Sequence, residues 1–261
     1  MLVLCSGMIR SGSTLQFNIV RNLVEILKVG VSNGYIGDFD VEKVKGNLIR
    51  WSADRQYHTI KMHKIPDDVD LIAGEDNLRI CYIYRDIRDV AASAKLKWRL
   101  DERDLMDALD KAVTGYSEII GRKRALIQKY ENVVKDVPRA VHEIATFLSL
   151  NACKDVIKTI MQECSLENTL RLTETIENTA WIKVKKKLRI LAKRLLSADS
   201  YDRIRAMAPR LRVYDQKTLL HPDHISKYGG AVGVWRSELS KREIETITKR
   251  YQSWFVEAGY E

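Results

Sequence analysis

Short apolar runs alternate with amphipathic stretches along the first half of this chain. Apolar runs typical of buried strands lie at residues 2–5, 59–62, 80–84 and 125–130. Between them, apolar residues recur with a period near 3.6 residues, most clearly at 13–27 and 139–150, which predicts helices. Short apolar strands that alternate with helices favour a mainly parallel sheet with helices on both faces. Such sheets bind ligands at the carboxyl ends of their strands.

The second half of the chain has fewer strand signals. After about residue 135 the pattern predicts mostly helix, and no repeat, linker or low-complexity tract interrupts it. The chain has 261 residues, of which 45% are hydrophobic and 30% charged, as in ordinary folded proteins. We therefore expect a single domain over residues 1–261, with a helical, basic excursion around 165–215.

The net charge of +9 is concentrated in one segment. Residues 181–212 contain eleven Lys and Arg but only two acidic residues, so the rest of the chain is neutral. This local basicity is not a general signature of nucleic-acid binding. The segment is interpreted as a solvated basic helix, as part of a lid over an acidic acceptor or a nucleotide, or as a contact for anionic membrane or nucleic acid.

The cysteines and the apolar runs indicate where in the cell the protein is expected. Cys5, Cys81, Cys153 and Cys164 are scattered without metal-type spacing, so we expect reduced thiols, no metal site and a cytoplasmic protein. No apolar run approaches the roughly 18–20 residues of a membrane-spanning helix. The first residues lack the basic and cleavage regions of a signal peptide, and we expect none.

A glycine-rich loop follows the first predicted strand. Gly7 and Gly12 have the spacing of the Walker A frame, and glycine permits close approach of the backbone. Backbone N–H groups of residues 11–14, at the start of a helix, would bind an anionic group. Ser13 occupies the Walker lysine position, while the loop's cation is Arg10. This argues against nucleoside-triphosphate chemistry, and a plain strand–helix turn is the alternative.

A second candidate anion site follows the strand at 80–84. Arg85 lies at its carboxyl end, and Ser93 is eight residues further on, within the next predicted helix. A guanidinium and a hydroxyl both suit a phosphate. In the alternative interpretation, Arg85 forms a surface ion pair with Asp86 while Ser93 merely packs.

These segments resemble motifs of one enzyme family, in family order across residues 2–260. The segment SGMIRSGSTL resembles the 5′-phosphosulfate loop of the sulfotransferases, and YRDIRDVAASA resembles their 3′-phosphate motif. KYENVVKDVPRAVHEIATFLSL is similar to their Tyr-Glu-Asp segment, and KYGGAVGVWR to their closing Gly-x-x-Gly-Asp-Trp-Lys motif. The resemblance implies a P-loop-like α/β fold with a helical C-terminal half. It also implies 3′-phosphoadenosine 5′-phosphosulfate (PAPS) as donor, 3′-phosphoadenosine 5′-phosphate (PAP) as product, and no metal.

The resemblance also implies which residues bind the donor. They are Arg10, Ser11, Gly12, Ser13, Thr14, Leu15, Arg85, Ser93, Tyr130, Lys227, Gly229 and Gly230. Three positions depart from the family pattern. Leu15 stands where members often have a Trp that stacks on adenine, so Tyr130 is a candidate for that role. Only Lys227 remains near the position of the family's Arg-Lys pair, and Val234 replaces the motif's Asp.

The segment 58–66 carries the candidate base. An alternating strand that ends at Met62 would place Lys61 and His63 on one face. The segment resembles the family's Lys-Thr-His-Leu-Pro, except that Lys64 is inserted before Ile65 and Pro66, which implies that His63 is the catalytic base and Lys61 a supporting cation. The Arg10 guanidinium would stabilise the charge that builds on the departing 5′-phosphate. A histidine that titrates near neutrality suits proton removal from an acceptor. A purely structural histidine is the alternative, and for His142 it is the expected role.

Together these features predict a soluble, bacterial-type sulfotransferase of secondary metabolism. It would move a sulfuryl group in line from PAPS to a hydroxyl or amine of a small-molecule acceptor. The acceptor itself is not readable, but contacts are expected around 33–58, 95–105 and 165–225. No nucleic-acid partner is expected, and the sequence does not set the oligomeric state. The alternatives are a P-loop kinase-like phosphotransferase and a nucleic-acid-binding protein that uses residues 181–212.

Overall fold

The computed structural model describes the whole chain except residues 38–39, 179–183, 185–213, 223 and 261. It divides into two compact units, one made of Met1–Cys164 with Ser226–Glu261 and the other of Ser165–Ile225. Most of the basic segment 181–212 lies outside the described residues. Among the described residues no helix is long and apolar enough to cross a bilayer. The expectation of a single domain stays a prediction.

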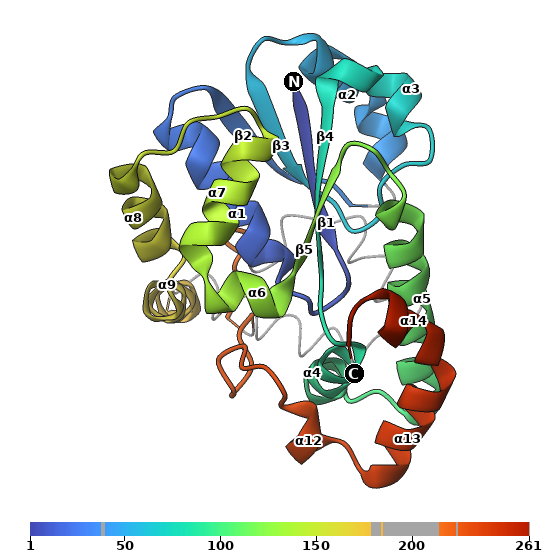
Figure 1. Ribbon diagram of the computed structural model, residues 1–261. Coiled ribbons are helices and arrows are strands. Elements are labelled where there is room, and N and C mark those ends of the chain that lie inside the picture. The colour runs from blue at the N-terminus through green and yellow to red at the C-terminus, as the bar shows by residue number, and fades with distance from the viewer. Residues whose placement is uncertain (38–39, 179–183, 185–213, 223, 261) are drawn as a thin grey trace. The chain divides into compact units, whose positions relative to one another are not determined.

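The larger unit is built on a five-stranded sheet in the order β2-β3-β1-β4-β5 (Figure 1). All neighbouring strands are parallel. The strands are β1 (Leu2–Gly7), β2 (Gly30–Tyr35), β3 (Tyr57–Lys61), β4 (Leu78–Tyr84) and β5 (Ala125–Lys129). The predicted parallel α/β sheet is confirmed, and its carboxyl edge gathers the loops after β1, β3 and β4.

Helices cover both faces of this sheet. In the larger unit they are α1 (Ser13–Ile26), α2 (Val41–Ala53), α3 (Val69–Ala73), the short 3-10 helix η2 (Glu75–Asn77), α4 (Ile87–Trp98), α5 (Glu102–Ile120), α6 (Tyr130–Lys135), α7 (Val137–Phe147), α8 (Lys154–Glu163), α12 (Trp235–Glu238), α13 (Lys241–Arg250) and α14 (Gln252–Glu257). The smaller unit contains α9 (Leu166–Asn178). Helices α1, α7 and α8 contact one another, and Figure 1 shows α5 and α14 on the other side of the sheet.

Strand β1 is buried along its whole length, because both faces of the sheet are covered. Leu2 and Leu4 belong to a large apolar cluster with α2, α5 and α14, to which Leu48, Tyr116 and Trp254 contribute. Since successive strand residues face opposite sides of the sheet, Val3 lies on the other face, toward α1. This buried central strand, paired with β3 and β4, ends directly at the glycine-rich loop.

The strands differ from the sequence-based expectation in several places: β1 extends to Gly7, β4 begins at Leu78, and β5 ends at Lys129. Strand β2 was not predicted, because the segment GVSNGY alternates poorly and lies at the sheet's edge, where its residues are mostly half-buried. Strand β3 ends at Lys61 rather than Met62, so His63 belongs to the loop beyond it. After β5 the described residues form helices, turns and loops, as the second-half pattern indicates.

Candidate functional site

The loop between β1 and α1 is held in place by its own side chains and by β4. The Ser11 hydroxyl lies within hydrogen-bond distance of two carbonyl oxygens, that of Met8 at 2.7 Å and that of Ile83 at 3.0 Å. Gly7 passes so close to Ile83 that a Cβ there would lie 2.6 Å from the same carbonyl oxygen. The Ser11 side chain and its backbone N–H, which donates to the Met8 carbonyl over 3.3 Å, therefore stabilise the loop itself. The binding of an anion by Ser11 stays a prediction.

Two residues of this loop adopt left-handed backbone conformations, Arg10 with φ 58° and Gly12 with φ 84°. A Cβ on Gly12 would lie 2.6 Å from Cδ2 of Tyr130. Tyr130 is 6% exposed, so little of its ring surface is open to an adenine base. Stacking of adenine on Tyr130 stays a prediction, as does the role of the half-buried Leu15.

Gly12→Ala tests this close approach. We expect the free energy of unfolding to fall by about 1–3 kcal/mol, because the new methyl group meets the Tyr130 ring at a strained φ. Urea unfolding measures the loss. Gly46→Ala is the control: nothing lies within 4 Å of its Cβ position, and a helical alanine is favourable. Equal stability of the two variants would contradict the prediction.

Arg10 joins the two anion sites that the sequence predicted separately. Its Nε donates to Oγ of Ser93 over 3.0 Å, so a cation of the β1–α1 loop meets a hydroxyl of α4. Burial lowers the pKa of Arg10, and the nearby charge of Arg85 lowers it further. Two guanidinium groups thus lie near each other at the sheet's carboxyl edge, which favours an anionic ligand.

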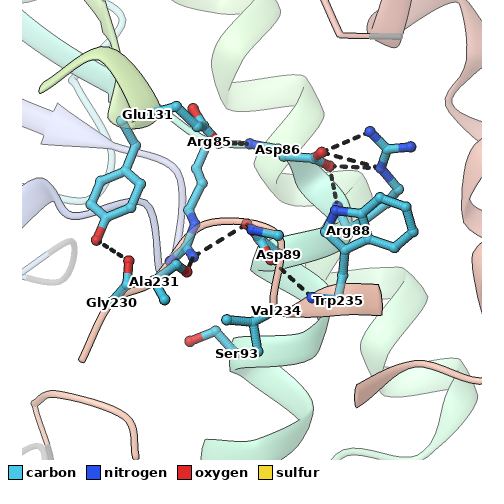
Figure 2. A network of polar contacts seen from close by, with 12 residues as sticks. Arg85, Asp86, Arg88, Asp89, Ser93, Glu131, Gly230, Ala231, Val234 and Trp235 are labelled. Atoms are coloured by element: carbon cyan, nitrogen blue, oxygen red, sulfur yellow. Dashed lines mark hydrogen bonds and ion pairs between the residues drawn. The ribbon is translucent and has the colours of Figure 1, made fainter. Parts of the chain in front are cut away.

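Arg85 is buried between α4 and the C-terminal part of the chain (Figure 2). Its Nη2 donates to the Ala231 carbonyl over 2.6 Å and lies 3.4 Å from Oδ2 of Asp89, while its Nε has no hydrogen-bond partner. The guanidinium carbon lies 4.5 Å from the centre of the Tyr130 ring. The alternative of a surface ion pair with Asp86 is wrong, because Arg85 is buried and Asp86 pairs with Arg88 at 2.7 Å.

Residues 229–235, here called the closing segment, lie against Arg85. The Gly230 carbonyl accepts the Tyr130 hydroxyl at 2.6 Å. Asp89 accepts the backbone N–H groups of Gly233 at 2.7 Å and of Trp235 at 3.0 Å, and Figure 2 shows the contact with Trp235. The closing segment is therefore fixed to both α4 and α6, although it is far from them in sequence.

Lys61, at the end of β3, extends to the start of α1, just after the glycine-rich loop. Its Nζ donates to Oγ1 of Thr14 over 2.5 Å, within the protein interior. Burial lowers the pKa of Lys61 to about 8; Cys5 opposes this shift, and Arg10 adds to it. A buried amine thus lies beside the hydroxyl at the start of α1.

His63 lies two residues beyond the end of β3, with its side chain exposed. The Ser6 hydroxyl donates to the His63 carbonyl over 3.0 Å, which fixes this backbone next to β1. The imidazole centre is 5.4 Å from the centre of the Tyr35 ring, in an edge-on arrangement. His63 is therefore anchored through its backbone at the carboxyl edge, while its imidazole stays open to solvent.

Comparison with known proteins decides the family. The family described as "Sulfotransferase domain" matches residues 3–190, which is more than half of the chain. The chain belongs to the sulfotransferase family. Its family and fold are those of a transferase of the sulfotransferase type. No curated protein matches the sequence.

Solved structures share the fold of this sulfotransferase at low sequence identity. Mouse sulfotransferase SULT7A1 complexed with PAP is 14% identical, with a TM-score of 0.58 over 97% of this chain and 83% of that chain. Retinol dehydratase with androsterone and the inactive cofactor PAP is 17% identical, with a TM-score of 0.55 over 97% and 80%. Retinol dehydratase with retinol and PAP is 19% identical, with a TM-score of 0.55 over 97% and 81%.

Lys227, one of the predicted donor-binding residues of the sulfotransferase, pairs with Glu238 rather than with the Arg10–Arg85 cluster. Lys227 is 62% exposed, and its Nζ lies 3.2 Å from Oε1 of Glu238. Hydrogen bonding to Tyr228 and to Glu238 raises the pKa of Lys227. Gly229 and Gly230 have φ values of 63° and 83°, so both adopt the left-handed backbone that favours glycine. Their binding of a phosphate stays a prediction.

The other histidines are arranged differently from His63. His58 is buried, with Nε2 2.9 Å from Oδ2 of Asp54 and Nδ1 3.1 Å from Oδ1 of Asn33. It has the structural role that is the usual one for a buried histidine. His142 is exposed on α7 rather than packed in the core. Among the described residues, no group of three or more His, Cys, Asp or Glu is placed to hold a metal ion.

Two carboxylates of the site were missed by the sequence analysis. Asp89 is four residues after Arg85, a spacing that places both on one face of a helical turn and could have suggested the pair. Glu131 follows Tyr130 in the Tyr-Glu-Asp segment. Its Oε1 accepts the backbone N–H of Asp86 at 3.0 Å, and its Oε2 accepts the Tyr260 hydroxyl at 2.8 Å.

Proposed function

We propose that this sulfotransferase transfers a sulfuryl group from PAPS to a hydroxyl or amine of a small-molecule acceptor and releases PAP. The observation that carries the proposal is the meeting of Arg10, Ser93 and Arg85 at the carboxyl edge of the sheet. PAP in the solved structures of similar fold supports the same donor.

The residues at this edge fit a ligand with a phosphate at each end. The buried Nε of Arg85 has no hydrogen-bond partner, and a 3′-phosphate oxygen would accept from it. An anion near Arg10 would offset the repulsion between the two guanidinium groups. Backbone N–H groups at the start of α1, together with Lys61 and Thr14, would hold the 5′-phosphosulfate.

In the proposed reaction His63 removes the proton from the acceptor hydroxyl or amine. The acceptor oxygen or nitrogen forms a bond to sulfur, while the bond between sulfur and the bridging phosphate oxygen breaks. Negative charge grows on that bridging oxygen and leaves with PAP. Lys61, Arg10 and the loop N–H groups stabilise this charge, and the proton stays on His63 until solvent accepts it.

The acceptor is proposed only as a class. The similar retinol dehydratase structures contain androsterone or retinol, which supports a small molecule. Tyr35 lies edge-on to His63, so the range 33–58 contributes at least one residue beside the proposed base. A cytoplasmic location and a place in secondary metabolism stay predictions.

Ligand-induced stabilisation tests the donor class. We expect millimolar PAP to raise the melting temperature, because a ligand that binds only the folded state stabilises it. ATP with Mg²⁺ should raise it much less, since Ser13 replaces the Walker lysine. Differential scanning fluorimetry measures both shifts. A shift with ATP and Mg²⁺ but none with PAP would favour the kinase-like alternative and overturn the proposal.

A further inference from the structure

Asp89 is a buried carboxylate that touches two separate parts of the site. Its side chain has no exposed surface, and it lies on the first turns of α4, four residues after Arg85. A buried carboxylate is costly unless charges or N–H donors compensate it. Here the compensation comes from Arg85 and from the closing segment.

The contacts of Asp89 with the closing segment are two charge-assisted hydrogen bonds. Oδ2 accepts the N–H of Gly233 at 2.7 Å, and Oδ1 accepts the N–H of Trp235 at 3.0 Å. Gly233 has φ 80°, so the turn between these N–H groups needs a glycine. Val234, between them, carries no side-chain acceptor, so α4 supplies the carboxylate that holds this turn.

The same carboxylate also orients Arg85. Nη2 of Arg85 lies between Asp89 Oδ2 and the Ala231 carbonyl oxygen, at 3.4 and 2.6 Å. With Nη2 held in this way, the guanidinium plane is fixed and its Nε remains without a protein partner. Asp89 therefore ties the closing segment to the arginine that carries the second anion site (Figure 2).

We infer that Asp89 is a positioning residue that assembles the 3′-phosphate pocket by fixing the closing segment against Arg85. The inference rests on the proposed function, since it assigns the pocket to the 3′-phosphate of PAPS and PAP. It assigns Asp89 no contact with the ligand. Without its carboxylate, the N–H groups of Gly233 and Trp235 lose their acceptor and Arg85 loses its ion-pair partner, keeping the contacts with the Ala231 and Arg10 carbonyls.

A purely electrostatic view gives the opposite expectation. A carboxylate 3.4 Å from Arg85 offsets part of the positive charge that attracts a phosphate. If that effect were dominant, removal of the charge would tighten the binding of PAP. The sign of the change therefore separates positioning from charge compensation.

Asp89→Asn is tested with two ligands that differ only in the 3′-phosphate, namely PAP and AMP. Calorimetry gives the ratio of their affinities for the wild-type protein and for the variant. We expect this preference for PAP to fall about 10- to 100-fold in the variant, with AMP binding nearly unchanged. Loss of general stability would weaken both ligands alike, so the ratio reports on the pocket.

Asp110→Asn is the control, since Asp110 on α5 is also a carboxylate paired with an arginine, but its partner at 2.6 Å is Arg250 on α13. Its ratio should equal that of the wild type. If Asp89→Asn does not fold, Gly233→Ala disturbs the same turn with Asp89 intact, and it should lower the ratio too.

An unchanged or increased ratio of PAP to AMP affinity in Asp89→Asn would overturn the role of Asp89. If that variant does not fold, the same result in Gly233→Ala would overturn it. A wild-type protein with no preference for PAP over AMP would instead overturn the proposed function. The two failures are thus told apart by which protein shows them.

Discussion

Replacement of His63 by Gln should lower kcat by about 10²–10⁴-fold, the usual contribution of a general base. Glutamine keeps a polar side chain of similar size but cannot act as the base that removes a proton from the substrate hydroxyl or amine. The backbone anchor from the Ser6 hydroxyl to the His63 carbonyl is independent of the side chain, so the fold should persist. Release of PAP from PAPS, with any acceptor that the wild type sulfates, measures the loss.

His142→Gln is the control for this experiment, because His142 is exposed on α7, a helix that carries none of the site residues named above. Its kcat should equal that of the wild type. PAP affinity should be unchanged in His63→Gln, since His63 is proposed to act on the acceptor. A kcat within tenfold of the wild type would remove His63 from the mechanism and leave the proton acceptor to another group.

The sheet could be predicted from the sequence because its central strands are buried on both faces. β1 contains the apolar run Leu2–Cys5 and β4 the run Ile80–Tyr84, and such runs are distinctive. β2 was missed for the opposite reason. It contains Gly30, Asn33 and Gly34, pairs on only one side, and is half-buried, so its strand conformation depends on β3 rather than on its own residues.

The cationic residues of the site could be predicted because they occur in local motifs. Arg10 lies in a glycine-rich loop, and Arg85 and Lys61 lie at strand ends. What the sequence did not show is which groups these cations meet. The contact between Arg10 and Ser93 joins residues 83 positions apart, and that between Asp89 and Gly233 joins residues 144 apart. Such pairs depend on the packing of α4 across the loop, which no local pattern encodes.

Lys61 illustrates a conflict between stability and function in this site. Its amine is buried, and its pKa falls from 10.5 to about 8, chiefly because burial disfavours the charge. Between pH 8 and 10.5 the unfolded chain holds a proton on this amine that the folded protein lacks, so stability rises with pH across this window. At pH 7 the folded protein carries the full cost of a charged, buried amine.

Lys61→Met should therefore stabilise the protein while it impairs catalysis. We expect the free energy of unfolding at pH 7 to rise by about 1–3 kcal/mol, after the lost hydrogen bond to Thr14 is allowed for. This gain should shrink as the pH rises toward 10.5, whereas kcat should fall about 10²-fold. Urea unfolding at several pH values measures the change in stability, and release of PAP measures kcat. Lys43→Met is the control: this lysine is exposed, so neither stability nor kcat should change. A variant less stable than the wild type at pH 7 would show that the contact with Thr14 outweighs the cost of burial.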